Sequence, residues 1–202
     1  MHFSPMDRET TEKGIMIAIG KIIPDGTYQA YHAEKIRPVM LNEFRGQWLI
    51  LLFYPGDFTF VCPTELAETG RLYPEFKKLG AEVCGVSTDS VYVHKAWHDS
   101  SPTIRSVEFP FIADTTGSLS RGFGVYLEDE GVALRGTFLI DPDGVLRAYE
   151  VHDNSIGRHA GEMLRKLQAA IRVREGQGEV CPASWQPGQS TLTPSLDLVG
   201  KL

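Results

Sequence analysis

The sequence predicts an α/β layer sandwich, in which helices cover a central sheet. Residues 48–54 form an entirely apolar run of strand length, which is typical of a strand buried on both faces of a sheet. We interpret residues 82–87 as a second buried strand, and helical patterns alternate with such runs along the chain. With 202 residues, the chain is long enough for one core with an appendage.

The segment after the first strand is expected to be helical. Pro63 is tolerated in the first turn of a helix, and the carboxylate of Glu65 suits the positive end of the helix dipole. Gly70 and Pro74 interrupt the pattern. We therefore expect a short helix followed by a second helix that ends at about residue 79.

The remaining elements follow from periodicity and turn chemistry. Strands are expected at 109–113, 134–140 and 145–151, and helices at 91–99 and 158–174. The link 141–144, Asp-Pro-Asp-Gly, is typical of a tight turn. We divide the chain into a flexible segment 1–14, a domain 15–175 and a Gly-, Pro-, Ser- and Thr-rich C-terminal arm 176–202.

Charge and hydropathy argue against several classes of protein. The chain has 20 Lys and Arg against 26 Asp and Glu, a net charge of −6, whereas nucleic-acid and membrane-surface binders usually carry a basic excess. The run 48–54 is far shorter than the ~20 residues of a membrane helix. The N-terminus lacks a secretory-signal pattern. We expect a cytoplasmic protein with no nucleic-acid or membrane partner.

Three cysteines, at positions 62, 84 and 181, are an odd and widely spaced set. Such a set is a poor disulfide framework for a secreted domain. In the cytosol, disulfides are usually transient and either catalytic or redox-sensing. The cysteines could therefore be core residues, metal ligands or reactive groups.

Cys62 stands where the buried strand gives way to the helix. Backbone N–H groups and the helix dipole favour negative charge on a thiol there, and the same groups could bind one oxygen of a peroxide while the thiolate attacks the other. Thr59 could point its hydroxyl into the same pocket. By position alone, a small buried hydrophobe is an equally good interpretation. A Cys-x-x-Cys dithiol is excluded, because position 65 is glutamate.

The stretch FYPGDFTFVCPTEL resembles the active-site loop of peroxiredoxins, Pro-x-x-x-Thr-x-x-Cys. VSTDS, HKAWH, RGTFLIDPDG, GEVCPASW and PSLDLVGKL extend the match, in family order, from about residue 45 to the end. The typical 2-Cys type is the most similar, in particular the bacterial alkyl hydroperoxide reductase C group. The resemblance implies a thioredoxin-like fold with a mixed central sheet, and a thiol-dependent reduction of hydrogen peroxide and organic hydroperoxides.

The resemblance also assigns roles to individual residues. Cys62 matches the peroxidatic cysteine, and Cys181 matches the resolving cysteine. Further positions match residues that shape or brace the peroxide pocket: Pro55, Thr59, Arg135, Glu65 and Arg158. In the family, the peroxidatic thiolate becomes a sulfenic acid and then forms an intersubunit disulfide with the resolving thiol.

Partners are implied in the same way. The resemblance implies a homodimer joined by a Cys62–Cys181 disulfide, a decamer built from dimers, and reduction by thioredoxin or a flavoprotein hydroperoxide reductase subunit. Strand 145–151 is a plausible sheet edge for pairing with its copy. No bound cofactor is required, because thiols carry the chemistry.

Other interpretations remain open. Cys84 lies in an expected core strand, and we interpret it as an inert buried thiol. His94 and His98 share a helical face and could bind a metal, although a polar or packing face beside Trp97 explains them more simply. A chaperone or structural ring with incidental thiols is the alternative to a peroxidase.

Overall fold

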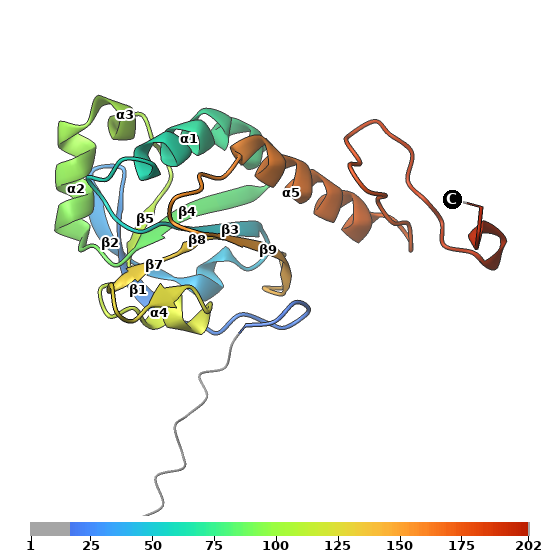
Figure 1. The fold of residues 1–202 in the computed structure, drawn as a ribbon, viewed down its shortest axis with the longest axis horizontal. Helices are drawn as coiled ribbons and strands as arrows, with labels where there is room; N and C mark the ends of the chain where they lie inside the picture. The colour runs from blue at the N-terminus through green and yellow to red at the C-terminus, as the bar shows by residue number, and fades with distance from the viewer. Residues whose placement is uncertain (1–16, 202) are drawn as a thin grey trace, which may run out of the picture.

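A seven-stranded mixed sheet runs through the computed structural model, which describes residues 17–201 (Figure 1). The expected flexible segment 1–14 lies outside the described residues. The strand order is β2-β1-β5-β4-β3-β8-β9. The strands are β1 (Thr27–His32), β2 (Lys35–Met40), β3 (Trp48–Phe53), β4 (Ala81–Ser87), β5 (Phe111–Ala113), β8 (Arg135–Ile140) and β9 (Leu146–His152).

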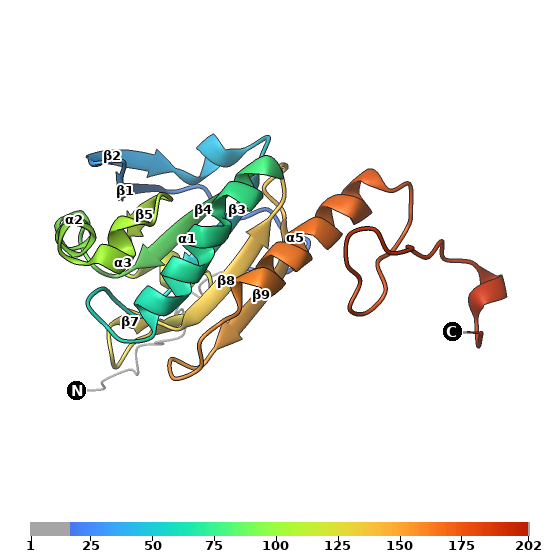
Figure 2. The same cartoon turned by 90° about the horizontal axis from the view of Figure 1, so that it is seen from above.

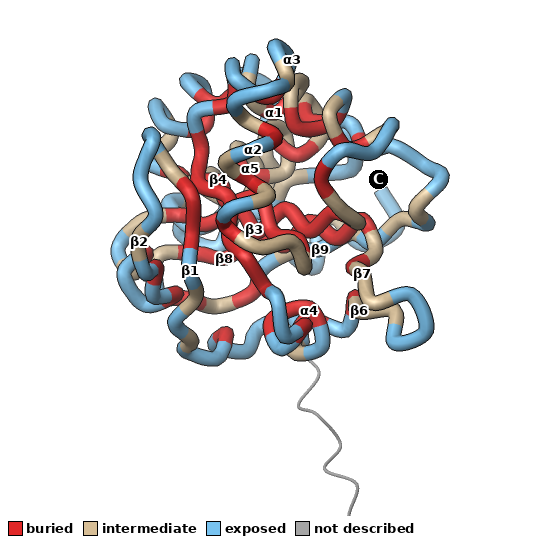
Figure 3. Tube along the Cα trace, turned by 90° about the vertical axis from the view of Figure 1, so that its left-hand side faces the viewer, coloured by how far each residue is buried: buried red, intermediate tan, exposed pale blue. Residues whose placement is uncertain are grey.

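Strand β3 forms the centre of the molecule, parallel to β4 and antiparallel to β8. All six of its residues are buried, as the run of apolar residues predicts. Ile50 and Leu52 pack into the core on one face of the sheet, and Leu49 and Leu51 pack into the core on the other. Figure 3 shows that the buried parts of the trace gather in these central strands.

Helices cover both faces of the sheet. On one face lie α1 (Cys62–Lys78) and α5 (Ala160–Glu175), which run side by side (Figure 2). The smaller helices α2 (Val91–Ser100) and α3 (Pro102–Arg105) contribute to the same core. The opposite face is covered by further short elements: the 3₁₀ helix η1 (Leu41–Phe44), α4 (Ser118–Gly122), and the hairpin of β6 (Tyr126–Leu127) and β7 (Val132–Ala133).

Two expectations about local structure were wrong or incomplete. Residues 62–78 form one helix rather than two, and this helix continues through Gly70 and Pro74. Packing of Leu66 and Phe76 into the core outweighs the weak helix propensity of glycine and proline at positions 70 and 74. The hairpin of β1 and β2, which extends the sheet beyond β5, was not predicted from the sequence.

The C-terminal arm leaves the body of the molecule beyond α5 (Figures 1 and 2). A bridge between Val180 and Leu192 closes a loop in it, and the indole of Trp185 donates a hydrogen bond to the carbonyl of Gln189. Its last element is the 3₁₀ helix η2 (Leu196–Leu198). Across residues 17–201, no helix is both long and apolar enough to cross a membrane.

Candidate active site

Cys62 is the first residue of α1, immediately after the loop that follows β3. Its side chain is fully buried, with 0% exposure. Pro63 follows it in the first turn, where a missing N–H costs no hydrogen bond. The backbone amides of Thr64 and Glu65 donate hydrogen bonds to the carbonyl of Val61. The positive end of the α1 dipole nevertheless lies beside the sulfur.

A guanidinium lies beside this sulfur. Arg135, the first residue of β8, has Nη1 3.4 Å from Cys62 Sγ and 2.7 Å from Glu65 Oε2. Its Nε donates a hydrogen bond to the carbonyl of Asn154 at 2.9 Å. These contacts hold the guanidinium in one orientation against the thiol.

Glu65 joins Arg135 to a second buried arginine. Arg158 donates to Glu65 through its backbone amide at 2.8 Å and through Nε and Nη2, each at 2.9 Å. Arg158 also donates to the carbonyl of Gly136. Burial would raise the pKa of Glu65, but the hydrogen bonds and charge of Arg158, with the charge of Arg135, hold it below its usual value. Two guanidiniums against one carboxylate leave a net positive charge next to the sulfur.

An open pocket of about 450 Å³ leads to Cys62. Thr59 and Pro55 line it, and the Thr59 hydroxyl donates to the carbonyl of Gly56 at 2.8 Å. Glu130 and Val132 of the β6–β7 hairpin complete one wall, and neither residue is predicted from the sequence. Gly131, which lies between them, predicts a turn at this place in the sequence. A turn residue alone does not predict that the turn reaches the pocket.

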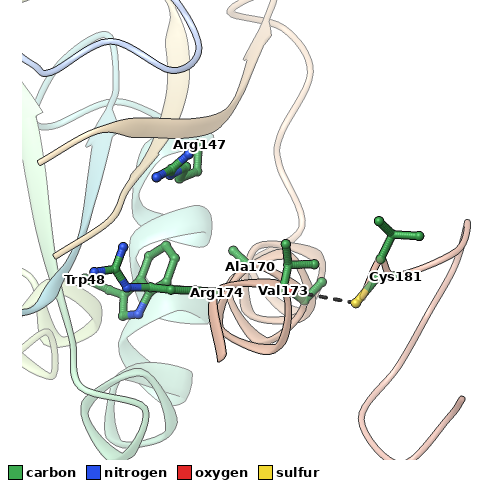
Figure 4. A pocket seen from close by; sticks show the side chains of 8 residues that line it. Trp48, Arg147, Ala170, Val173, Arg174 and Cys181 are labelled. Carbon is green, nitrogen blue, oxygen red and sulfur yellow. Dashed lines mark hydrogen bonds between the residues drawn. The ribbon is translucent and has the colours of Figure 1, made fainter. Parts of the chain in front are cut away.

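Cys181 is separate from this pocket. It is partly exposed on the C-terminal arm, with Sγ 3.8 Å from the carbonyl oxygen of Ala169 in α5. It borders a different pocket, of about 600 Å³, together with Trp48, Arg147 and Arg174 (Figure 4). The structure therefore brings Pro55, Thr59, Cys62, Glu65, Arg135 and Arg158 together but leaves Cys181 elsewhere.

The third cysteine, Cys84, is fully buried in β4. Burial raises the pKa of its thiol well above the ordinary value, and the negative charge of Glu82 adds to this effect. Such a thiol is a poor nucleophile at neutral pH. This environment supports the interpretation of Cys84 as an inert core residue.

The two histidines of α2 have different partners. His94 Nδ1 lies 2.7 Å from Asp57 Oδ2 with both side chains fully buried, whereas His98 Nδ1 lies 3.6 Å from Glu34. Ligand atoms of Glu34, His98 and Asp99 lie within 4.8 Å of one another. The ammonium of Lys95 is 2.6 Å from Asp99 and competes with any cation there. His94 and His98 thus do not form a shared pair of metal ligands.

A buried thiol at the start of a helix, an arginine in contact with it and a thioredoxin-like sheet define the peroxiredoxin class of thiol enzymes. The family model described as AhpC/TSA matches residues 19–149, and a model described as the C-terminal domain of 1-Cys peroxiredoxin matches residues 170–202. The chain belongs to the AhpC/TSA family and is a peroxiredoxin, an oxidoreductase of the peroxidase type.

Known proteins resemble the chain over most of its length. Alkyl hydroperoxide reductase C of Amphibacillus xylanus is 49% identical over 188 residues, which is 93% of this chain and all of the relative. Alkyl hydroperoxide reductase C of Escherichia coli K12 is 49% identical over 86% of this chain and 93% of its own length. The crystal structure of reduced Plasmodium vivax 2-Cys peroxiredoxin aligns with a TM-score of 0.85 at 34% identity, covering 89% of this chain and 94% of that one.

Proposed function

We propose that the chain reduces hydrogen peroxide and organic hydroperoxides to water or alcohols, and serves antioxidant defence and redox homeostasis. The observation that carries this proposal is the contact of 3.4 Å between Arg135 Nη1 and the buried sulfur of Cys62 at the end of an open pocket. The relatives named alkyl hydroperoxide reductase C support the same substrate class.

In the first step, the thiolate of Cys62 attacks the terminal peroxide oxygen. The O–O bond breaks, the sulfur becomes a sulfenic acid, and water or an alcohol leaves after taking up a proton. Arg135 stabilises the charge on the separating oxygens. The Thr59 hydroxyl, which donates to Gly56, keeps its oxygen lone pairs to accept a hydrogen bond from the peroxide. Pro55, on the pocket wall, excludes water from the sulfur.

In the second step, Cys181 resolves the sulfenic acid. Its thiol condenses with the oxidised Cys62 of another copy, which forms an S–S bond and releases water. Cys62 and Cys181 line different pockets of one chain, which supports a disulfide between two subunits. Strand β9 offers the edge for a homodimer, because it ends the sheet and exposes 54% of Tyr149 and 40% of Val151. A decamer of such dimers follows from the resemblance.

Thioredoxin or a flavoprotein hydroperoxide reductase subunit would then restore both thiols by exchange. We propose a cytoplasmic location, because three widely spaced cysteines are a poor disulfide framework for a secreted domain and suit a reducing compartment. The net charge of −6 argues against nucleic acid or a membrane surface as a partner.

A coupled NAD(P)H assay tests the function by crossing several peroxides with both reductase systems. Cys62→Ser should abolish peroxide consumption, and Cys181→Ser should complete a single turnover without forming a covalent dimer on a non-reducing gel. Cys84→Ala is the matched control and should keep both activities. Turnover by the Cys62→Ser variant would refute the peroxidase mechanism.

A further inference from the structure

A buried polar network ties the loop before Cys62 to helix α2. Asp57 lies in that loop, and its Oδ2 is 2.7 Å from Nδ1 of His94. Its other carboxylate oxygen accepts a hydrogen bond of 2.7 Å from the hydroxyl of Tyr54. The side chains of Asp57 and His94 are both 0% exposed, so their hydrogen bond lies in the buried interior, where such bonds are stronger than in water.

The loop needs such support, because its backbone is strained. Phe58 has φ of 55°, a left-handed conformation that is unfavourable for a bulky residue. Its ring lies 6.0 Å from that of Trp97, which is also on α2. The backbone amide of Asp57 is held separately by the carboxylate of Asp89 at 2.8 Å. Helix α2 therefore holds the loop at two adjacent positions.

This loop must open during turnover. Cys62 is fully buried at its end, whereas Cys181 lies on the arm, and no second thiol can reach a buried sulfur unless the chain around it moves. The closed loop keeps Thr59 and Pro55 in the peroxide pocket. The free energy that holds the loop closed thus favours the first step and opposes the second.

We propose that His94 is a positioning residue that acts through Asp57 to hold the active-site loop closed, and so limits the rate of disulfide formation with Cys181. The inference rests on the proposed peroxidase function. His94 does not line the peroxide pocket; it affects how often the loop opens.

Two reactions of the sulfenic acid compete, and their ratio reports on the loop. Condensation with the thiol of Cys181 forms the S–S bond and releases water. Attack on a second hydroperoxide transfers one oxygen to the sulfur, which gives a sulfinic acid and releases water or an alcohol. Only the condensation requires an open loop, so easier opening lowers the ratio of sulfinate to disulfide.

The experiment compares three variants at one peroxide concentration, with mass spectrometry of the quenched products. His94→Phe keeps a ring of similar size without the hydrogen-bond donor. His94→Asn restores a donor close to the place of Nδ1. His98→Asn is the matched control four residues along the same helix, where the side chain contacts Tyr31 and Glu34 rather than the loop.

His94→Phe should lower the ratio of sulfinate to disulfide about tenfold, the change that corresponds to losing one hydrogen bond to a charged group. His94→Asn should recover most of the wild-type ratio, and His98→Asn should equal it. A purely structural role would lower the melting temperature of His94→Phe and leave the ratio unchanged, which would overturn the proposal. Equal ratios in the Phe and Asn variants would also overturn it.

Tyr54→Phe provides a second test in case His94→Phe does not fold. It removes the other hydrogen bond to Asp57 while the ring stays in the core, and it should lower the ratio in the same direction. An unchanged ratio in this variant contradicts the proposal. Peroxide consumption by the wild-type protein, measured in the same series of experiments, tests the peroxidase function separately.

Discussion

Glu65→Gln should destabilise the folded protein by about 3–5 kcal/mol, the cost of breaking a buried ion pair from one side. The carboxylate of Glu65 accepts four hydrogen bonds, one from Arg135 and three from Arg158, and all three side chains are 4% exposed. Glutamine keeps the size of the side chain but offers a single acceptor oxygen. Its NH₂ group would face the N–H donors of the two arginines. Two buried guanidiniums then share no counter-charge.

The acid dependence of stability gives a second readout of the same group. Because the pKa of Glu65 lies below its usual 4.5 in the folded protein, its stabilisation is complete above pH 4.5 and is lost as pH falls through the folded value. In that window it contributes a slope of at most about 1.4 kcal/mol per pH unit. The variant lacks this contribution, so its stability should fall less steeply with acid.

Urea unfolding, followed by circular dichroism at neutral pH and on both sides of pH 4.5, measures both effects. Protein concentration must be constant, since association shifts apparent stability. Glu162→Gln is the control: its partner Arg165 is 25% exposed, so the loss should stay below about 1 kcal/mol. If Glu65→Gln were as stable as the control, or showed the wild-type acid slope, the reasoning about the arginine network would be wrong.

Three further outcomes follow from the site. Arg135→Lys should slow the reaction with peroxide about 10²-fold or more in stopped-flow measurements, because an ammonium cannot contact Cys62 and a backbone carbonyl at once. An unchanged rate would show that the mechanism does not depend on the shape of the guanidinium. Thr59→Val should slow the same step while Thr59→Ser retains it, and equal rates would argue against the hydroxyl. Iodoacetamide should label Cys181 in the native protein and leave Cys84 unlabelled until denaturant is added, as peptide mapping would show.

The central strands could be predicted from sequence because burial on both faces leaves a continuous apolar run, as in β3. The β1–β2 hairpin could not. Its turn consists of Ala33 and Glu34, with φ of 48° and 61°, where a sequence search expects glycine or asparagine. Tertiary pairing with β5 stabilises a turn that its own residues disfavour.

In the candidate site, too, some residues can be identified from the sequence and others cannot. Cys62, Thr59 and Arg135 stand in local motifs, so the sequence identifies them. The link between His94 and Asp57 joins residues 37 positions apart, and neither periodicity nor motif spacing reveals that one buried side chain faces the other. Only the packing of α2 against the loop makes the pair visible.

The two outer strands of the sheet differ in how readily they can add another strand. At one end, β2 contains Pro38, which has no N–H to offer a neighbour, flanked by the charged Arg37. At the other end, β9 presents Tyr149 and Val151 to solvent. Pairing of β9 with its copy would use the receptive edge of both molecules and leave only the two blocked edges outside. Such a dimer would therefore end on both sides in strands that resist further edge-to-edge pairing, so the sheet would not grow into a fibre.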